Sequence, residues 1–245
     1  MSTVKEIQSV QNACRLLEVL AERQPLGVSE LARAVGFDKS AAHRLAVTLH
    51  RVDWLDRTED GRWRISPTLA RIARHAGAAS LVATMRPHME QLRDETGETV
   101  MLVAIEDARL RVRAVVESHH TLRIAAPVGA ELPLLHSSAA RAIAAHLPPD
   151  ELAALRSAHP NLDDDSALAR IRRRGYAVND REIVAEARVV GAPVLAANGH
   201  PLAALIVSGP ASRVTRSRVA SIGEALLRAT TGAASLAPGA STVIK

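Results

Sequence analysis

One stretch determines how the first third of the chain folds: residues 28–65, which read VSELARAVGFDKSAAHRLAVTLHRVDWLDRTEDGRWRI. Its beginning predicts a short helix that Ser29 caps and that continues to Val35, with Leu31 and Val35 facing inward. Gly36 follows, and glycine readily adopts the left-handed backbone that turns a chain sharply after a helix. A second helix is therefore expected to begin just after this turn.

The second helix is expected to be amphipathic. Its apolar residues Ala42, Leu45, Leu49 and Val52 recur at helical spacing, so this side is predicted to pack on a core. A longer helix after a glycine turn, with polar and basic groups near its start, suits side-chain contacts with base edges in the major groove. Taken alone, the same pattern also fits a merely solvated helix face. The polar side carries Lys39, Ser40, His43, Arg44 and Arg51.

A hairpin is predicted after the second helix. Asp60-Gly61 lies between two short alternating segments, and this dipeptide is a strong signal for a tight β-turn. Trp63 and Ile65 would then face inward and leave Arg62 and Arg64 facing outward, where they could meet DNA phosphates. Two helices and a hairpin in this order predict a winged helix-turn-helix. The DNA-binding candidates are Ser29, Lys39, Ser40, His43, Arg44, Arg51, Arg62 and Arg64.

A helix is also expected before this stretch, over residues 9–23. Val10, Cys14, Leu17 and Leu20 are spaced three to four residues apart, which predicts one buried stripe that includes Cys14. Cys14 is the one cysteine in the chain, so an internal disulfide, an iron-sulfur cluster and a cysteine-rich zinc module are excluded. Packing is the favoured role for Cys14 over redox sensing.

Composition narrows the class of protein further. The 245 residues are 47% hydrophobic, enough for one large or two modest packed domains. Aromatic residues make up only 2%, which excludes a single-strand nucleic-acid reader that stacks bases on rings. The formal net charge is +5, and more than half of this surplus lies in residues 1–75, which suggests a polyanion-binding head on a nearly neutral body.

Location is predicted from the absence of sorting signals. The opening residues show no apolar run behind a positive start, so no signal peptide is expected and the cytoplasm is the predicted compartment. The apolar stretch from Val189 to Ser208 is interrupted by Gly191, Pro193 and Asn198-Gly199, so we interpret it as a buried hairpin rather than a membrane span.

The rest of the chain alternates between helical and strand patterns. A helix from Pro67 is expected to break at Gly77, resume to Met85 and restart at Arg86-Pro87. Further helices are predicted over 137–146, 150–159 and 166–174, with Asp163-Asp164-Asp165 capping the last of these and Arg172-Arg173-Arg174 at its end. A final helix begins with Ser212 as its cap. The expected strands are 99–105, 110–116, 121–125, 189–196 and 202–208.

The quoted motifs resemble those of the isocitrate-lyase regulator (IclR) family of bacterial transcription factors. The resemblance rests on residues 28–36, on Lys39-Ser40 and His43-Arg44-Leu45, and on residues 60–65, and it continues through motifs such as Gly97-Glu98-Thr99 and Ala192-Pro193-Val194 to about residue 230. One departure is Asp38, where the family commonly has proline; a carboxylate there suits the helix dipole but repels phosphate.

The resemblance implies an α+β protein with two functional parts. The parts are a winged helix-turn-helix that binds double-stranded operator DNA and an effector-binding domain similar to a GAF domain, with an antiparallel sheet flanked by helices. A homo-oligomer, either a dimer or a dimer of dimers, is implied because helix-turn-helix dimers match two half-sites. The expected divisions are residues 1–66 for the DNA-binding domain, 67–85 for the linker helix, 86–231 for the GAF-like domain and 232–245 for a flexible tail.

An effector pocket is likewise implied by the resemblance. This sequence departs from the polar residues that the family usually has in the pocket. Val189 stands where the family frequently has cysteine, and Asn179 stands where it has its first pocket acid. Ile206 replaces one of two pocket serines, and Leu135 stands where histidine is common. Fewer polar anchors disfavour a compact oxo-acid, which predicts a larger, more apolar effector such as an aromatic or other catabolic organic acid. The implied lining is Ser137, Ser138, Ala139, Asn179, Ala187, Val189, Ile206 and Ser208.

Other chemistries have weaker support in the sequence. His119-His120 with His136 is a conceivable metal set, but adjacent residues on a strand point to opposite faces, so we predict neither a metal site nor a cofactor. No nucleophile elbow, phosphate loop or zinc-protease motif occurs, and no catalytic residue is assigned. The prediction is thus a DNA-binding regulator, and a repressor is favoured. The alternatives are a metal-dependent hydrolase on the GAF-like body and a DNA-independent protein-interaction dimer.

Overall fold

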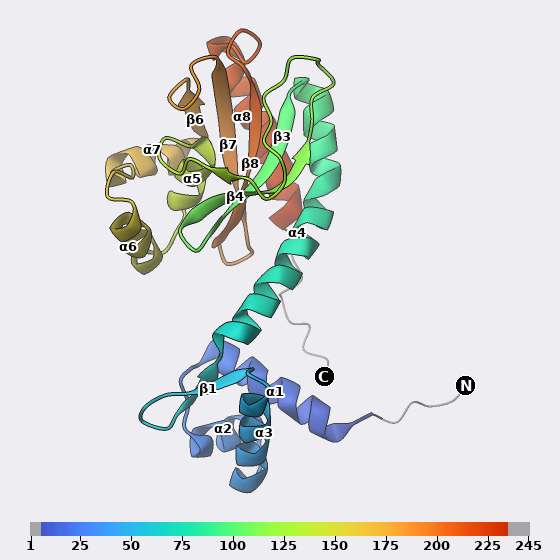
Figure 1. Cartoon of the computed structure of the whole chain (residues 1–245), viewed down its shortest axis with the longest axis vertical. Helices are drawn as coiled ribbons and strands as arrows, with labels where there is room; N and C mark the ends of the chain where they lie inside the picture. The colour runs from blue at the N-terminus through green and yellow to red at the C-terminus, as the bar shows by residue number, and fades with distance from the viewer. Residues whose placement is uncertain (1–5, 235–245) are drawn as a thin grey trace, which may run out of the picture. The chain divides into compact units, whose positions relative to one another are not determined.

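The computed structural model describes residues 6–234, without the side chains of residues 73–78 and 232–234. The chain divides between Ala78 and Ala79 into two compact units. This division falls within α4 (Pro67–Thr96), whose residues belong partly to each unit (Figure 1).

The first unit is a winged helix-turn-helix. It contains α1 (Gln8–Glu22), α2 (Val28–Val35), α3 (Lys39–Arg51) and a hairpin of β1 (Leu55–Arg57) and β2 (Trp63–Ile65). Leu26 extends the hairpin by exchanging two backbone hydrogen bonds with Trp63, of 2.9 and 2.8 Å. These contacts bring three helices and the hairpin around one core. The buried core residues are Leu16, Leu20, Leu31, Ala46, Leu49, Leu55 and Trp63.

The buried stripe of α1 differs from the prediction. Val10 is 56% exposed and Cys14 is also exposed, whereas Leu16 and Leu20 are fully buried. The physical reason is that α1 carries two apolar stripes, and α2 and α3 pack on the one that runs through Leu16 and Leu20. Leu17 lies on the outer stripe at its border with the buried one and is half-buried. The prediction that Cys14 lies in the core is therefore wrong.

The ends of α2 and α3 also correct the predictions. Gly27, not Ser29, is the N-cap of α2, and its backbone N–H donates to Oε2 of Glu30 at 2.7 Å, so Ser29 lies in the first helical turn. Val52 follows the last helical residue of α3 and is exposed, because the chain leaves the helix there before the apolar stripe can continue. The glycine turn is confirmed, since Gly36 has a φ of 72°.

The segment that joins the two units is one uninterrupted helix. α4 contains Pro87 in its interior and passes through Gly77, so the predicted break and restart are both wrong. Met85, Met89 and Leu92 on this helix are buried against the sheet of the second unit. Such packing outweighs the local helix-breaking tendency of a single glycine or proline.

The second unit is a six-stranded antiparallel sheet with helices on both faces (Figure 1). The spatial order of its strands is β5-β4-β3-β8-β7-β6. The strands are β3 (Thr99–Glu106), β4 (Arg109–Val116), β5 (Glu131–Leu132), β6 (Ala177–Asp180), β7 (Ala187–Leu195) and β8 (Pro201–Pro210). The helices after α4 are α5 (Ser138–Ala144), α6 (Pro149–Ala158), α7 (Asp165–Arg174), the short η1 (Arg216–Arg218) and α8 (Val219–Ala234).

Two cores cover the two faces of this sheet. Residues that alternate along β3 divide between them: Val100 and Leu102 join the core under α4 and α8, and Met101 and Val103 join the core under α5, α6 and α7. This alternation is the period of two expected of a strand that is buried on both sides. The sheet therefore has one face available to each helical layer.

Several predicted elements of the second unit are confirmed and others are wrong. The cap at Asp164 is confirmed, with its Oδ1 accepting from the Ala167 backbone N–H at 2.8 Å. The strand expected over 121–125 is absent, because β5 pairs with β4 at this edge of the sheet. The final helix α8 begins at Val219 after a 3-10 turn, so Ser212 does not cap it. The strands β5 and β6 were not predicted.

Residues 235–245, most of the predicted flexible tail, lie outside the described residues, and α8 extends to Ala234. Among the described helices, none is long and apolar enough to cross a membrane.

Candidate nucleic-acid interface and effector site

The recognition helix α3 is fixed at its start and along one side. Asp38 is its N-cap, and one carboxylate oxygen accepts from the backbone N–H of Ala41 at 2.8 Å. Ala42, Ala46 and Leu49 are buried on the inner side. The predicted contact residues Lys39, Ser40, His43, Arg44 and Arg51 are all exposed. The structure thus brings these five side chains together on one solvent-facing side of α3.

The hairpin after α3 has the form that the sequence predicted. β1 and β2 pair antiparallel with Leu55 opposite Ile65 and Arg57 opposite Trp63, and Gly61 in the turn has a φ of 79°. Trp63 is only 2% exposed, and the Arg57 guanidinium lies 5.5 Å from the centre of its ring. These contacts anchor the strands of the wing to the core of the unit.

The two arginines on the wing differ in their surroundings. Arg64 is exposed and lies 4.0 Å from the Asp56 carboxylate. Arg62 instead points back to α2, where its Nη2 lies 2.7 Å from Oε2 of Glu30 and its Nε donates to the Pro25 carbonyl at 3.2 Å. The ion pair of Arg62 with Glu30 therefore connects the wing to α2.

Glu30 was missed by sequence reasoning, although its spacing from Gly27 is that of a capping box. The hydrogen bond from the Gly27 backbone holds the pKa of Glu30 below its usual value, and Arg62 lowers it further. Glu30 is thus held as a carboxylate between the start of α2 and the wing. Ser29, the remaining DNA-binding candidate, is exposed in the first turn of α2.

The implied effector residues meet on the sheet face that carries α5. Asn179 on β6, Val189 on β7, Ser208 on β8 and Thr99 on β3 stand opposite one another across four neighbouring strands. Directly opposed residues of antiparallel strands share a face, so these four side chains form one row. Ile206 belongs to the next row on the same face, and Ala187 precedes Val189 by two residues. Asn179, Ala187, Ile206 and Ser208 are buried.

The start of α5 lies against this row. Ser137 is its N-cap, and Ser137, Ser138 and Ala139 are all buried. Asn179 donates from Nδ2 to the His136 carbonyl at 2.8 Å, which connects β6 to the residue before the cap. Among the described residues, Ser138 Oγ is a buried side-chain oxygen with no hydrogen-bond partner.

A glycine permits the close approach of α5 to the sheet. A Cβ on Gly191 of β7 would lie 2.9 Å from Cγ2 of Ile206 and 3.2 Å from both the backbone carbon and the oxygen of Ser138. These distances are shorter than ordinary carbon contacts, so only glycine fits without displacement. Gly191 is thus a positioning residue of the candidate site that sequence reasoning did not single out.

An ionic cluster lies beside the start of α5. Arg141 donates to both Glu182 carboxylate oxygens at 2.6 and 2.8 Å and to Oδ2 of Asp163 at 2.6 Å. The Arg141 bonds hold the pKa of Glu182 below its usual range, and Glu182 in turn raises the pKa of Arg141. His136, with a left-handed φ of 65°, lies 3.3 Å from Glu182. This cluster fixes the loop after β6 to α5.

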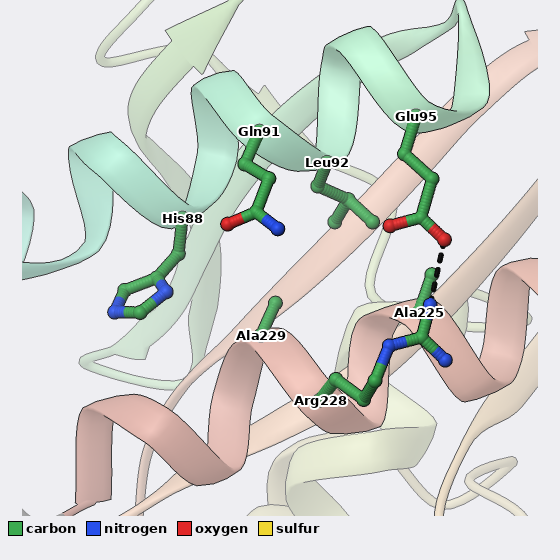
Figure 2. A pocket seen from close by; sticks show the side chains of 7 residues that line it. All are labelled: His88, Gln91, Leu92, Glu95, Ala225, Arg228 and Ala229. Atoms are coloured by element: carbon green, nitrogen blue, oxygen red, sulfur yellow. Dashed lines mark hydrogen bonds and ion pairs between the residues drawn. The ribbon is translucent and has the colours of Figure 1, made fainter.

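A separate cavity of about 230 Å³ lies between α4 and α8. Figure 2 shows Glu95 of α4 facing Arg228 of α8, and these side chains form an ion pair of 2.6 Å. Both helices cover the sheet face opposite to α5, so this cavity is distinct from the implied effector residues. The lining residues are His88, Gln91, Leu92, Glu95, Ala225, Arg228 and Ala229.

Among the side chains that the structure describes, no group of three or more histidine, cysteine, aspartate or glutamate residues is arranged to hold a metal ion. His119 is exposed and lies 3.9 Å from the Asp94 carboxylate, while His136 lies beside Glu182.

A winged helix-turn-helix joined to an α+β unit of this topology defines a DNA-binding transcription regulator. Residues 73–235 match the family described as bacterial transcriptional regulator IclR C-terminal, and residues 9–59 match the IclR helix-turn-helix domain. The chain therefore belongs to the IclR family, which confirms the resemblance seen in the sequence. Its relatives are transcriptional regulators and not enzymes.

Individual relatives cover almost the whole chain. The transcriptional repressor IclR of Escherichia coli K12 is 29% identical over 242 residues, which cover 91% of this chain and 88% of that one. HmgR of Pseudomonas aeruginosa is 27% identical in structural alignment, with a TM-score of 0.59 and coverage of 96% and 100%. An IclR homolog of Microbacterium hydrocarbonoxydans, complexed with 4-hydroxybenzoate, is 25% identical, with a TM-score of 0.55 and coverage of 93% and 98%.

Proposed function

We propose that this regulator is a repressor whose operator binding is modulated by a small organic acid. Binding of DNA by the chain follows from its family, and the residues that make the contacts are our proposal. The exposed side of α3 would read base edges, and the wing would contact phosphates. Arg62, which pairs with Glu30, would support the phosphate contacts of the wing by holding the hairpin against α2. The proposed DNA-binding residues are Ser29, Lys39, Ser40, His43, Arg44, Arg51, Arg62 and Arg64.

The observation that carries the effector proposal is the buried, unpaired hydroxyl of Ser138. A buried polar atom without a partner costs about 1–3 kcal/mol, so such atoms are uncommon unless something else satisfies them. Ser138 lies at the start of α5, against the sheet face that carries Asn179 and Ser208. A polar group of a ligand that reached this position would supply the missing hydrogen bond.

The chemical class of the effector is argued from the remaining lining. Val189, Ile206 and Ala187 present aliphatic surface, which favours a ligand with an apolar body beside its polar group. The 4-hydroxybenzoate complex of the Microbacterium homolog supports an aromatic acid. The proposed lining is Ser137, Ser138, Ala139, Asn179, Ala187, Val189, Ile206 and Ser208.

The active form is proposed to be a homo-oligomer in the cytoplasm, where operator DNA is accessible. The outer stripe of α1 supports self-association, because Ile7 and Val10 are more than half exposed and Cys14 and Leu17 continue their spacing of three and four residues. This spacing is the one by which helices pack on each other. A two-fold dimer would present two recognition helices to two half-sites.

The test measures operator affinity in the presence of candidate acids. Fluorescence anisotropy on the intergenic DNA beside the gene would be repeated with 4-hydroxybenzoate, pyruvate and glyoxylate. We expect the aromatic acid to change the Kd at least about fivefold, since coupling of this kind is commonly 5- to 150-fold.

Two serine variants provide the control. Ser138→Ala should abolish the response to the acid, and Ser157→Ala, on the exposed side of α6, should retain it. A response to pyruvate or glyoxylate with none to aromatic acids would contradict the proposed ligand class. An equal response in Ser138→Ala and wild type would contradict the proposed site.

A further inference from the structure

Asp38 is the N-cap of α3 and presents its carboxylate to solvent. One of its carboxylate oxygens is held by the Ala41 N–H at 2.8 Å, and the side chain is exposed. Among the described residues, no other hydrogen bond or ion pair engages the carboxylate. The cap therefore fixes the direction of the side chain and leaves its second oxygen free to accept.

The position of this free oxygen suits base recognition. Residues at the start of a recognition helix are those that contact base edges in the major groove. Lys39 and Ser40 follow Asp38 directly, and Lys39 and Arg44 are exposed cations in the first half of α3. Their positive charge offsets part of the repulsion between the Asp38 carboxylate and DNA phosphates.

The chemistry of a carboxylate limits what it can recognise. An ionised carboxylate only accepts hydrogen bonds, and in the major groove the exocyclic amine of cytosine is a donor that aspartate and glutamate accept from. Guanine presents only acceptors there, which repel a carboxylate, and adenine places its amine donor beside the N7 acceptor, whereas cytosine presents the amine donor alone. A carboxylate held in one direction by a cap loses less side-chain freedom on contact than a mobile one, and it cannot turn toward another base.

We propose that Asp38 is a specificity-determining residue that accepts a hydrogen bond from the exocyclic amine of a cytosine in each operator half-site. The proposal rests on the proposed DNA interface of α3. The aspartate that stands where the family commonly has proline would thereby help to select the operator sequence.

The test separates reading from capping, because asparagine caps helices as well as aspartate does. DNA would be selected from a random double-stranded library by the wild type, by Asp38→Asn and by Glu59→Gln. The last variant removes one negative charge from the exposed turn of the wing and serves as the charge control. Thermal unfolding of each variant would verify that the fold is retained.

The expected result is a cytosine preference at one position of each half-site in the wild type. Asp38→Asn should reduce that preference about tenfold, because a charge-assisted hydrogen bond is replaced by a weaker or mismatched one. The other positions should be unchanged, and Glu59→Gln should keep the wild-type motif.

Two results would overturn the proposal. If Asp38→Asn selects the wild-type motif with only a uniform gain in affinity, Asp38 acts as a cap and a charge and does not read a base. If the wild type selects no motif at all, the proposed interface of α3 fails as well, and the two failures are thereby distinguished.

Discussion

Replacing Gly191 by alanine should displace the start of α5 from the sheet. The added Cβ would lie 2.9 Å from Cγ2 of Ile206, whereas carbon atoms pack at about 3.5–4.0 Å. Ile206 is β-branched and only 3% exposed, so its side chain has little freedom to turn aside. The second obstacle, 3.2 Å away, is the backbone of Ser138, which no rotamer change can move.

The size of the effect follows from two opposing contributions. Overpacking in a close-packed interior costs about 1–3 kcal/mol. Alanine also restricts the unfolded chain, which returns about 0.4–1 kcal/mol. We therefore expect Gly191→Ala to lower the free energy of unfolding by about 1.3 kcal/mol, the difference between the midpoints of these two ranges.

Urea unfolding and hydrogen exchange would test this expectation. Gly199→Ala is the matched control, because Gly199 has a φ of 83° and its added Cβ would meet nothing within 4 Å. Both variants should lose stability, the control through backbone strain of about 1–2 kcal/mol. Only Gly191→Ala should accelerate exchange in α5 and weaken acid binding. If amide exchange in α5 of Gly191→Ala equals that of the wild type and stability is unchanged, the predicted displacement of α5 is refuted.

Three further predictions concern DNA contacts, pH and assembly. Arg44→Ala should cost about 1–3 kcal/mol of binding free energy on the native operator and little on scrambled DNA, whereas Arg62→Ala should weaken binding to both DNAs alike. If fluorescence anisotropy shows that both variants lose equal affinity for both DNAs, base reading by α3 is contradicted. Burial holds the pKa of His146 below its ordinary value of 6.5, so the unfolded chain takes up a proton more readily than the folded protein and stability falls as the pH drops below about 6.5. His146→Gln should flatten that fall in urea titrations between pH 8 and 5, and parallel curves would contradict the assignment. A short bismaleimide should cross-link Cys14 between two chains if the outer stripe of α1 pairs, and Val10→Glu should abolish the product; cross-linking that Val10→Glu leaves intact would contradict that interface.

The winged unit could be predicted from sequence because its signals are local. Asp60-Gly61 fixes a hairpin within a few residues, and Gly36 ends α2 through its own backbone preference. The inner stripe of α1 could not be predicted, because Cys14 and Leu16 belong to apolar stripes of similar strength. Only the partners that pack on α1 decide which stripe is buried.

The candidate site depends on contacts between residues far apart in sequence. The approach of Ser138 to Gly191, the bond from Arg62 to Glu30 and the pairing of Arg141 with Glu182 each join separate elements. No periodicity in the sequence encodes such pairs. The continuity of α4 has the same origin, since its burial against the sheet overrides Pro87.

The most direct test of the account compares specific with general DNA binding. Fluorescence anisotropy would measure the affinity of the full chain for the intergenic DNA beside its gene and for scrambled DNA of equal length, at two salt concentrations. Contacts with phosphates alone weaken steeply with salt, whereas base contacts add affinity for one sequence only. We predict that binding to the native fragment alone survives the higher salt. Equal, salt-sensitive binding to both fragments, unchanged by added organic acids, would contradict it.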